Sequence, residues 1–178
     1  MSKLSTIDIV RVALMCAVMV LCSWIAIPTA VPFTLQTLGV FLSFGILGGK
    51  KSTLAIVVYV ILGAIGLPVF ASFSGGLGIL LGINGGFIWG FVLATLAMWL
   101  LQTLLNKSKL LPLIMLVGLL VCYTCGTAWY MIYCASSGTA VGLTAALTLC
   151  VLPYVIPDLL KLGLSLIIIR RIKGASKQ

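Results

Sequence analysis

The chain has 178 residues, of which 62% are hydrophobic and 7% are charged, and its mean hydropathy is +1.33. Soluble globular proteins carry about a quarter charged residues, so this composition excludes a soluble domain and indicates an integral membrane protein. The sequence has no His and only two acidic residues, Asp8 and Asp158. A His-based triad and a His-containing zinc site are therefore excluded. A pair of catalytic carboxylates is nearly impossible, because Asp8 belongs to the first apolar segment and Asp158 to the last. We expect no enzyme activity, metal or other cofactor, although a Ser or Cys mechanism is left open.

Long apolar runs between short polar breaks predict an all-α bundle, since a barrel would show alternation in segments of about ten residues. We predict one transmembrane domain, residues 1–178, with six helices spanning residues 7–27, 35–49, 52–66, 85–105, 110–134 and 153–172. Ten basic residues fall on one side of the membrane in this topology, and the connections on the other side carry no charge. This asymmetry predicts that both termini are cytoplasmic. The net charge of +9 thus reflects topology, and we expect no nucleic-acid partner.

Pairs of small residues occur four positions apart in two predicted helices. Ala13 and Ala17 lie in the first, and Gly86 and Gly90 lie in the fourth. This spacing lets another helix backbone approach closely. Each pair fits either packing within the bundle or an interface with a partner.

Two stretches near the second helix raise functional hypotheses. In "TAVPFTLQTLG" (29–39), Thr34 and Gln36 stand at the entrance to the helix, where they would cap it or line a pocket. "GILGGKKS" (45–52) is not a phosphate-binding loop, because Phe44 and Lys51 stand where the motif needs Gly and Ser or Thr. If the protein takes part in a process driven by ATP, other subunits must therefore bind the ATP.

The outer half of the bundle is predicted to hold a pocket. The second and third helices, about 15 residues each, would span about 22 Å, which is short for a hydrocarbon core of about 30 Å. The connection 67–86 is Gly-rich, apolar and uncharged, and irregular backbone at membrane depth survives only when it is buried or lines a cavity. Asn84, at its end, can be an N-cap, which would not prevent its side chain from also facing the pocket.

Asp158 and Lys161 lie inside the last apolar run. Pro153 and Pro157 predict a break and a new helix start, which would place Asp158 in the first turn, where the helix dipole favours an anion. The two residues are either a structural ion pair or ligand contacts. We favour ligand contact, because an apolar pair would stabilise the fold at least as well and intramembrane charges are commonly functional. Cys122 and Cys125 form a CxxC that we interpret as packing, since nothing completes a metal site.

Four stretches together resemble the BioY family, the biotin-specific substrate-binding component of energy-coupling-factor vitamin transporters. They are "VPFTLQTLGV" (31–40), "ILGAIGLPVFASFSGGLG" (61–78), "GINGGFIWGF" (82–91) and "LPYVIPDLLK" (152–161). The resemblance implies a six-helix fold with one biotin in its outer half, in the bacterial cytoplasmic membrane and its lipid. It also implies a transmembrane coupling subunit and two cytoplasmic ATPases as partners. One position departs from the family pattern, because Pro157 stands where Gly often precedes the Asp.

The family's binding motifs map onto Asn84, Asp158 and Lys161, and its helix-docking motif maps onto Ala13 and Ala17. Asp158 can accept a ureido N–H of biotin, and Asn84 can both donate and accept. Further candidate ligand-binding residues are Gln36, Phe33, Phe70, Trp89 and Tyr154, the four aromatic ones as apolar walls. Two alternatives are the same fold serving another small vitamin, and a small intramembrane enzyme or assembly factor.

Overall fold

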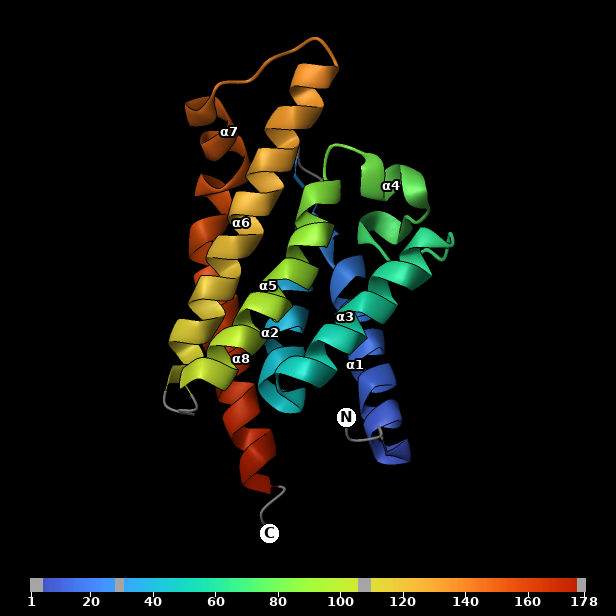
Figure 1. The fold of residues 1–178 in the computed structure, drawn as a ribbon, viewed down its shortest axis with the longest axis vertical. Coiled ribbons are helices and arrows are strands. Elements are labelled where there is room, and N and C mark those ends of the chain that lie inside the picture. The colour runs from blue at the N-terminus through green and yellow to red at the C-terminus, as the bar shows by residue number, and fades with distance from the viewer. Residues whose placement is uncertain (1–4, 28–30, 106–109, 176–178) are drawn as a thin grey trace.

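The computed structural model describes residues 5–27, 31–105 and 110–175, and within them the chain is mainly helical (Figure 1). The helices are α1 (Thr6–Trp24), α2 (Gln36–Leu47), α3 (Gly49–Ala64), α4 (Leu77–Leu81), α5 (Gly85–Leu105), α6 (Leu111–Ser136), α7 (Leu143–Cys150) and α8 (Leu152–Ala175), with a 3-10 turn, η1 (Ala71–Phe73). Each of the six predicted helices corresponds to one of these, and the short helices α4 and α7 are additional. The helical-bundle fold class is confirmed.

Four of the described helices, α1, α5, α6 and α8, are long and apolar enough to cross a membrane. The helices α2 and α3 have 12 and 16 residues, which correspond to about 18 and 24 Å at the usual rise. They follow one another directly at Gly48, which has a φ of 76° and so adopts a conformation that favours glycine. The shortness of these two helices agrees with the prediction and leaves room in the outer half of the bundle.

The first predicted helix, 7–27, extends too far. The helix α1 ends at Trp24, and the chain then forms a two-stranded antiparallel hairpin of β1 (Ala26–Ile27) and β2 (Phe33–Thr34). Ala26 pairs with Thr34 across this hairpin. Apolar residues continue to residue 27, so hydropathy alone did not indicate the end of the helix.

The last predicted region breaks at Val151, between α7 and α8, and not at Pro157. Pro153 lies in the first turn of α8, where a missing N–H costs little. Pro157 lies inside the helix without ending it. Asp158 is therefore in the second turn of α8, and the prediction that placed it in the first turn, favoured by the helix dipole, is wrong.

The helices α5 and α6 pack closely through the glycines of the fourth predicted helix. A Cβ atom on Gly86 would lie 2.2 Å from the Cβ atom of Trp129, and one on Gly90 would lie 3.2 Å from the carbonyl oxygen of Cys122. Both glycines are buried. Their spacing therefore serves packing within the bundle, which decides between the two interpretations of this pair.

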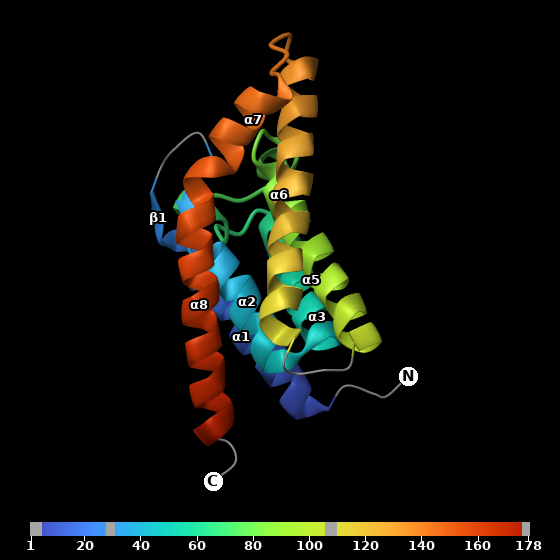
Figure 2. The ribbon, with the colours of Figure 1, turned by 90° about the vertical axis from the view of Figure 1, so that its left-hand side faces the viewer.

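The two ends of the molecule differ in charge. The start of α1, the junction of α2 with α3 and the end of α8 lie at one end, and α4 and α7 lie at the other (Figure 1). The first end carries Arg11, Lys50, Lys51, Arg170, Arg171 and Lys173. Lys3, Lys107, Lys109 and Lys177 are outside the described residues. Seen from the side, α8 and α6 run along the bundle and α7 leans on the upper part of α6 (Figure 2).

Candidate ligand-binding site

A cavity of about 270 Å³ lies between the start of α2, the segment 70–74, α4, and the walls formed by α5, α6, α7 and α8. Six of the eight predicted ligand-binding residues line it: Gln36, Phe70, Asn84, Tyr154, Asp158 and Lys161. Segments far apart in the sequence thus form one pocket. It lies where the sequence predicted a pocket, between the Gly-rich connection and the helices. The cavity lies near the lower end of the size range for small-molecule sites, about 300–1,000 Å³.

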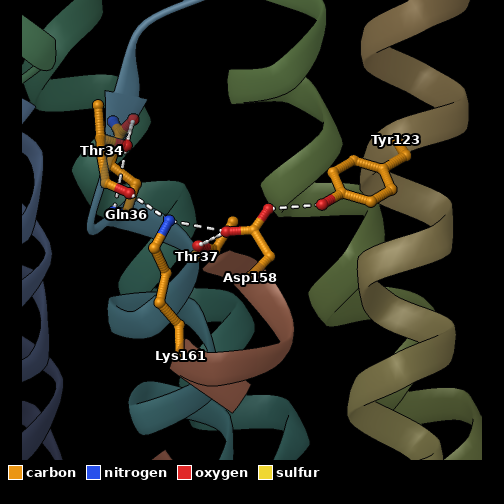
Figure 3. A network of polar contacts seen from close by, with 6 residues as sticks. All are labelled: Thr34, Gln36, Thr37, Tyr123, Asp158 and Lys161. Carbon is orange, nitrogen blue, oxygen red and sulfur yellow. Dashed lines mark hydrogen bonds and ion pairs between the residues drawn. The ribbon is translucent and has the colours of Figure 1, made fainter. Parts of the chain in front are cut away.

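Asp158 is buried, with 3% of its surface exposed, and accepts hydrogen bonds on both oxygens (Figure 3). Its Oδ1 accepts from the ammonium of Lys161 at 2.7 Å and from the hydroxyl of Thr37 at 2.8 Å. Its Oδ2 accepts from the phenol of Tyr123 at 2.7 Å. Three donors from α2, α6 and α8 thus stabilise the carboxylate, because hydrogen bonds to an ionised acceptor are the stronger kind.

Lys161 is equally well matched. Its ammonium donates to the carbonyl oxygen of Thr34 at 2.7 Å in addition to Asp158, and it lies 4.2 Å from the centroid of the Phe33 ring. The side chain is 7% exposed. Asp158 and Lys161 form an ion pair, and this pair forms part of the cavity wall.

Gln36 lines the cavity, but its amide is engaged by the protein. The Nε2 atom donates to the hydroxyl of Tyr59 at 2.7 Å, and Oε1 accepts from the hydroxyl of Thr34 at 2.9 Å. The hydroxyl of Thr34 in turn accepts the backbone N–H of Gln36 at 3.2 Å. Thr34 and Gln36 therefore both stabilise the start of α2 and line the pocket.

Asn84 differs from the other polar residues of the wall. Its Oδ1 atom is buried and accepts no hydrogen bond from the described part of the chain. An N-cap side chain would accept a backbone N–H of the following helix, so the N-cap interpretation of Asn84 is wrong. A buried acceptor without a donor is costly, and this one belongs to the wall of the cavity.

The predicted aromatic residues divide into two groups. Phe70 and Tyr154 line the cavity, and the Tyr154 phenol donates to the carbonyl oxygen of Val31. Phe33 is outside the cavity wall, although it stacks on Tyr154 with 6.4 Å between ring centroids. Trp89 is also outside the wall: it is 41% exposed and its Nε1 donates to the carbonyl oxygen of Leu80.

Sequence reasoning missed several residues of the site. Thr37 and Tyr123 hold Asp158, and Phe87, Ile88 and Phe91 form much of the apolar wall along α5. Tyr123 stands between the two cysteines of the CxxC, where only the thiols suggested any chemistry. A phenol in an apolar helix needs a partner when it is buried, and this requirement was the available signal. The six cysteines are unpaired, and the described residues contain no cluster of three metal ligands.

The fold and the cavity define a small helical membrane protein with a ligand-binding site in one half of the bundle. The chain belongs to the BioY family, whose model matches residues 1–178. It is 41% identical over 144 residues to the probable biotin transporter BioY of Pyrococcus horikoshii, with 81% of this chain and 82% of the relative covered. It is 37% identical over 155 residues to the biotin transporter BioY of Thermotoga maritima, with 86% and 79% covered.

A solved structure has the same fold. The crystal structure of the S-component for biotin from an ECF-type ABC transporter superposes with a TM-score of 0.83 at 24% identity, and the match covers 98% of this chain and 95% of that chain. Four of the described helices are long and apolar enough to cross a membrane, and the relatives are named as transporters. The chain is therefore a multi-pass membrane protein of a transporter family.

Proposed function

We propose that this protein is the biotin-capturing subunit of an energy-coupling-factor vitamin transporter. The observation that carries the proposal is that Asp158 and Asn84 both line the same cavity. The ureido group of biotin offers two N–H donors and one carbonyl. An ionised carboxylate has about four acceptor positions, and three on Asp158 are occupied. Asp158 and the Oδ1 of Asn84 can therefore each accept one ureido N–H.

The remainder of the cavity suits the rest of the ligand. Phe70, Phe87, Ile88, Phe91 and Tyr154 provide apolar surface around the polar groups. The thiophane ring and the acyl chain of biotin are apolar, so their burial against these side chains favours binding. Phe33 and Trp89, outside the wall, would act only indirectly.

We propose that a partner subunit binds to the exposed face of α1. Ala13 and Ala17 are both exposed, whereas Val12 and Cys16 on the same helix are buried. A stripe of small residues on a surface lets another helix approach. We place the transmembrane coupling subunit there and the two ATPase subunits on the cytoplasmic side, with the protein in lipid of the cytoplasmic membrane.

The test is calorimetric titration of the detergent-purified protein with biotin, together with an Asp158→Asn variant. We expect one-to-one binding by the wild type. The variant should bind at least about tenfold more weakly, because a neutral amide replaces the carboxylate that accepts the ureido N–H, and a hydrogen bond to a charged group contributes about 1.5–3 kcal/mol. A Thr124→Ala variant, on the exposed face of α6, is the matched control and should bind as the wild type does.

Lipoate is the control ligand, because it carries the same kind of acyl tail without a ureido group. A site built to hydrogen-bond the ureido group should reject it strongly. Equal binding of lipoate and biotin would contradict the assigned roles of Asp158 and Asn84. A folded wild type that binds no biotin would refute the assignment, and a screen of other vitamins would follow.

A further inference from the structure

No basic residue that the structure describes, other than Lys161, is near the cavity to pair with the carboxylate at the acyl end of the ligand. The sequence contains no Lys, Arg or His in residues 12–49, 52–106 or 110–160. The basic residues that the structure describes, apart from Lys161, lie at the end of the molecule opposite to α4 and α7 (Figure 1). Among the described residues, Lys161 is thus the one basic residue in the cavity wall.

Lys161 lies at the ureido end of the proposed site. Two of its three N–H donors are engaged by the protein, because its ammonium donates to Asp158 and to the Thr34 carbonyl, both at 2.7 Å. Since it is bonded to Asp158, the proposed ureido contact, it lies away from the acyl end of the ligand. The ion pair leaves the cavity wall with no net charge, and an ionised carboxylate buried without a cation is strongly unfavourable.

Ser72 is the one described residue of the cavity wall that is also exposed at the surface. Its neighbours Ala71 and Ser74 line the cavity too, so we place the opening of the cavity at this uncharged segment. The Ser74 hydroxyl donates to the carbonyl oxygen of Ala71 at 2.7 Å, which leaves the Ser72 hydroxyl as the polar group nearest to this opening. A ligand carboxylate at Ser72 would keep its hydration shell, so its charge would contribute little to the free energy of binding.

We propose, building on the proposed function, that the cavity recognises the ureido bicycle and does not require an ionised carboxylate, so it also binds biotin derivatives with an uncharged acyl end. The class includes the primary amide, the methyl ester and biotin joined through an amide to an amino acid. The site would then capture biotin released in conjugated form as well as the free acid.

The first experiment compares biotin, biotinamide and biotin methyl ester by calorimetry on the full chain at neutral pH. We expect the three dissociation constants to agree within about threefold. An amide and an ester that both bind more than tenfold more weakly than biotin would overturn this inference and leave the proposed function intact. Loss of binding of biotin itself would instead refute the proposed function.

The second experiment adds a cation at the opening. In a Ser72→Lys variant, the affinity for biotin should rise several-fold relative to the affinity for biotinamide. The new ammonium can pair with the carboxylate of biotin, and biotinamide has no carboxylate. Ser72→Gln is the matched control, since it adds length without charge, and it should leave the ratio of the two affinities unchanged. An unchanged ratio in the Lys variant would contradict the placement of the acyl end at Ser72.

Discussion

Asp158 shows at the scale of one residue how a buried charge is kept in a membrane protein. An ion pair with Lys161 alone would not offset the cost of removing both groups from water. The structure adds the hydroxyls of Thr37 and Tyr123, so that the carboxylate has three donors from three helices. The side chain is thereby fixed in one orientation, which is what a site for a small ligand requires.

Tyr123 should act as a positioning residue for Asp158. A Tyr123→Phe variant removes one hydrogen bond to a charged group and keeps the ring, and such a bond contributes about 1.5–3 kcal/mol. We expect biotin and biotinamide to bind more weakly by the same factor, about tenfold or more, because the change is confined to the ureido contact that both ligands make. Titration calorimetry on both ligands measures this.

The matched control is Tyr133→Phe, which removes a phenol from the same helix outside the cavity wall. This variant should bind biotin like the wild type. A Tyr123→Phe protein with unchanged affinity would contradict the positioning role. Equal weakening by both variants would point to a general effect on α6.

The site residues that the sequence located are those that break an apolar pattern. Asn84, Asp158 and Lys161 are costly in lipid, so their presence in apolar segments by itself indicates a function. Thr37 and Tyr123 did not stand out, because a hydroxyl in an apolar helix is ordinary. Trp89 was placed in the pocket on its aromatic character, but it points away from the wall that Ile88 and Phe91 form, since successive helical residues are turned by about 100°.

At the scale of helices, the sequence located the segments well and their ends less well. The range 85–105 was predicted without error because the Gly-rich connection ends at Asn84, where the apolar stretch begins. The end of α1 and the start of α8 depended on contacts between distant segments: β1 pairs with β2, and Tyr154 of α8 bonds to Val31. Hydropathy contains no information about such contacts.

The close packing of α5 on α6 gives a stability prediction. In a Gly86→Ala variant the new Cβ atom would lie 2.2 Å from the Cβ atom of Trp129, so the helices must separate. Overpacking of this kind costs about 1–3 kcal/mol. We expect a lower temperature of unfolding in detergent, measured by a thermal shift of the purified protein.

Gly163→Ala on α8 is the control for this substitution. A Cβ atom on Gly163 would meet no other atom within 4 Å, and alanine favours the helix over glycine. Its unfolding temperature should equal or exceed that of the wild type. A Gly86→Ala protein as stable as Gly163→Ala would show that the two helices are not held together at this point.

At the scale of the whole molecule, charge and cavity are separated. Apart from Lys161, the basic residues that the structure describes lie at the end where α1 begins and α8 ends. The helices α4 and α7, which contribute to the cavity wall, lie at the other end (Figure 1). Lys and Arg are retained on the cytoplasmic side during membrane insertion. We therefore predict that the cavity faces the external side, where a capture subunit would meet its ligand, and that both termini lie in the cytoplasm.

Reporter fusions in a bacterial host test this orientation. Green fluorescent protein fused after residue 178 should fluoresce, and alkaline phosphatase at the same position should be inactive, because the first folds in the cytoplasm and the second only outside it. Fusions after Gly138, in the connection between α6 and α7, should give the opposite pair of results.

Replacing Lys50 and Lys51 by Gln should weaken the preference for one orientation, since the orientation depends on the number of basic residues on the retained side. An active phosphatase at the C-terminus of the wild type would place the cavity opening in the cytoplasm and contradict a role in uptake from outside.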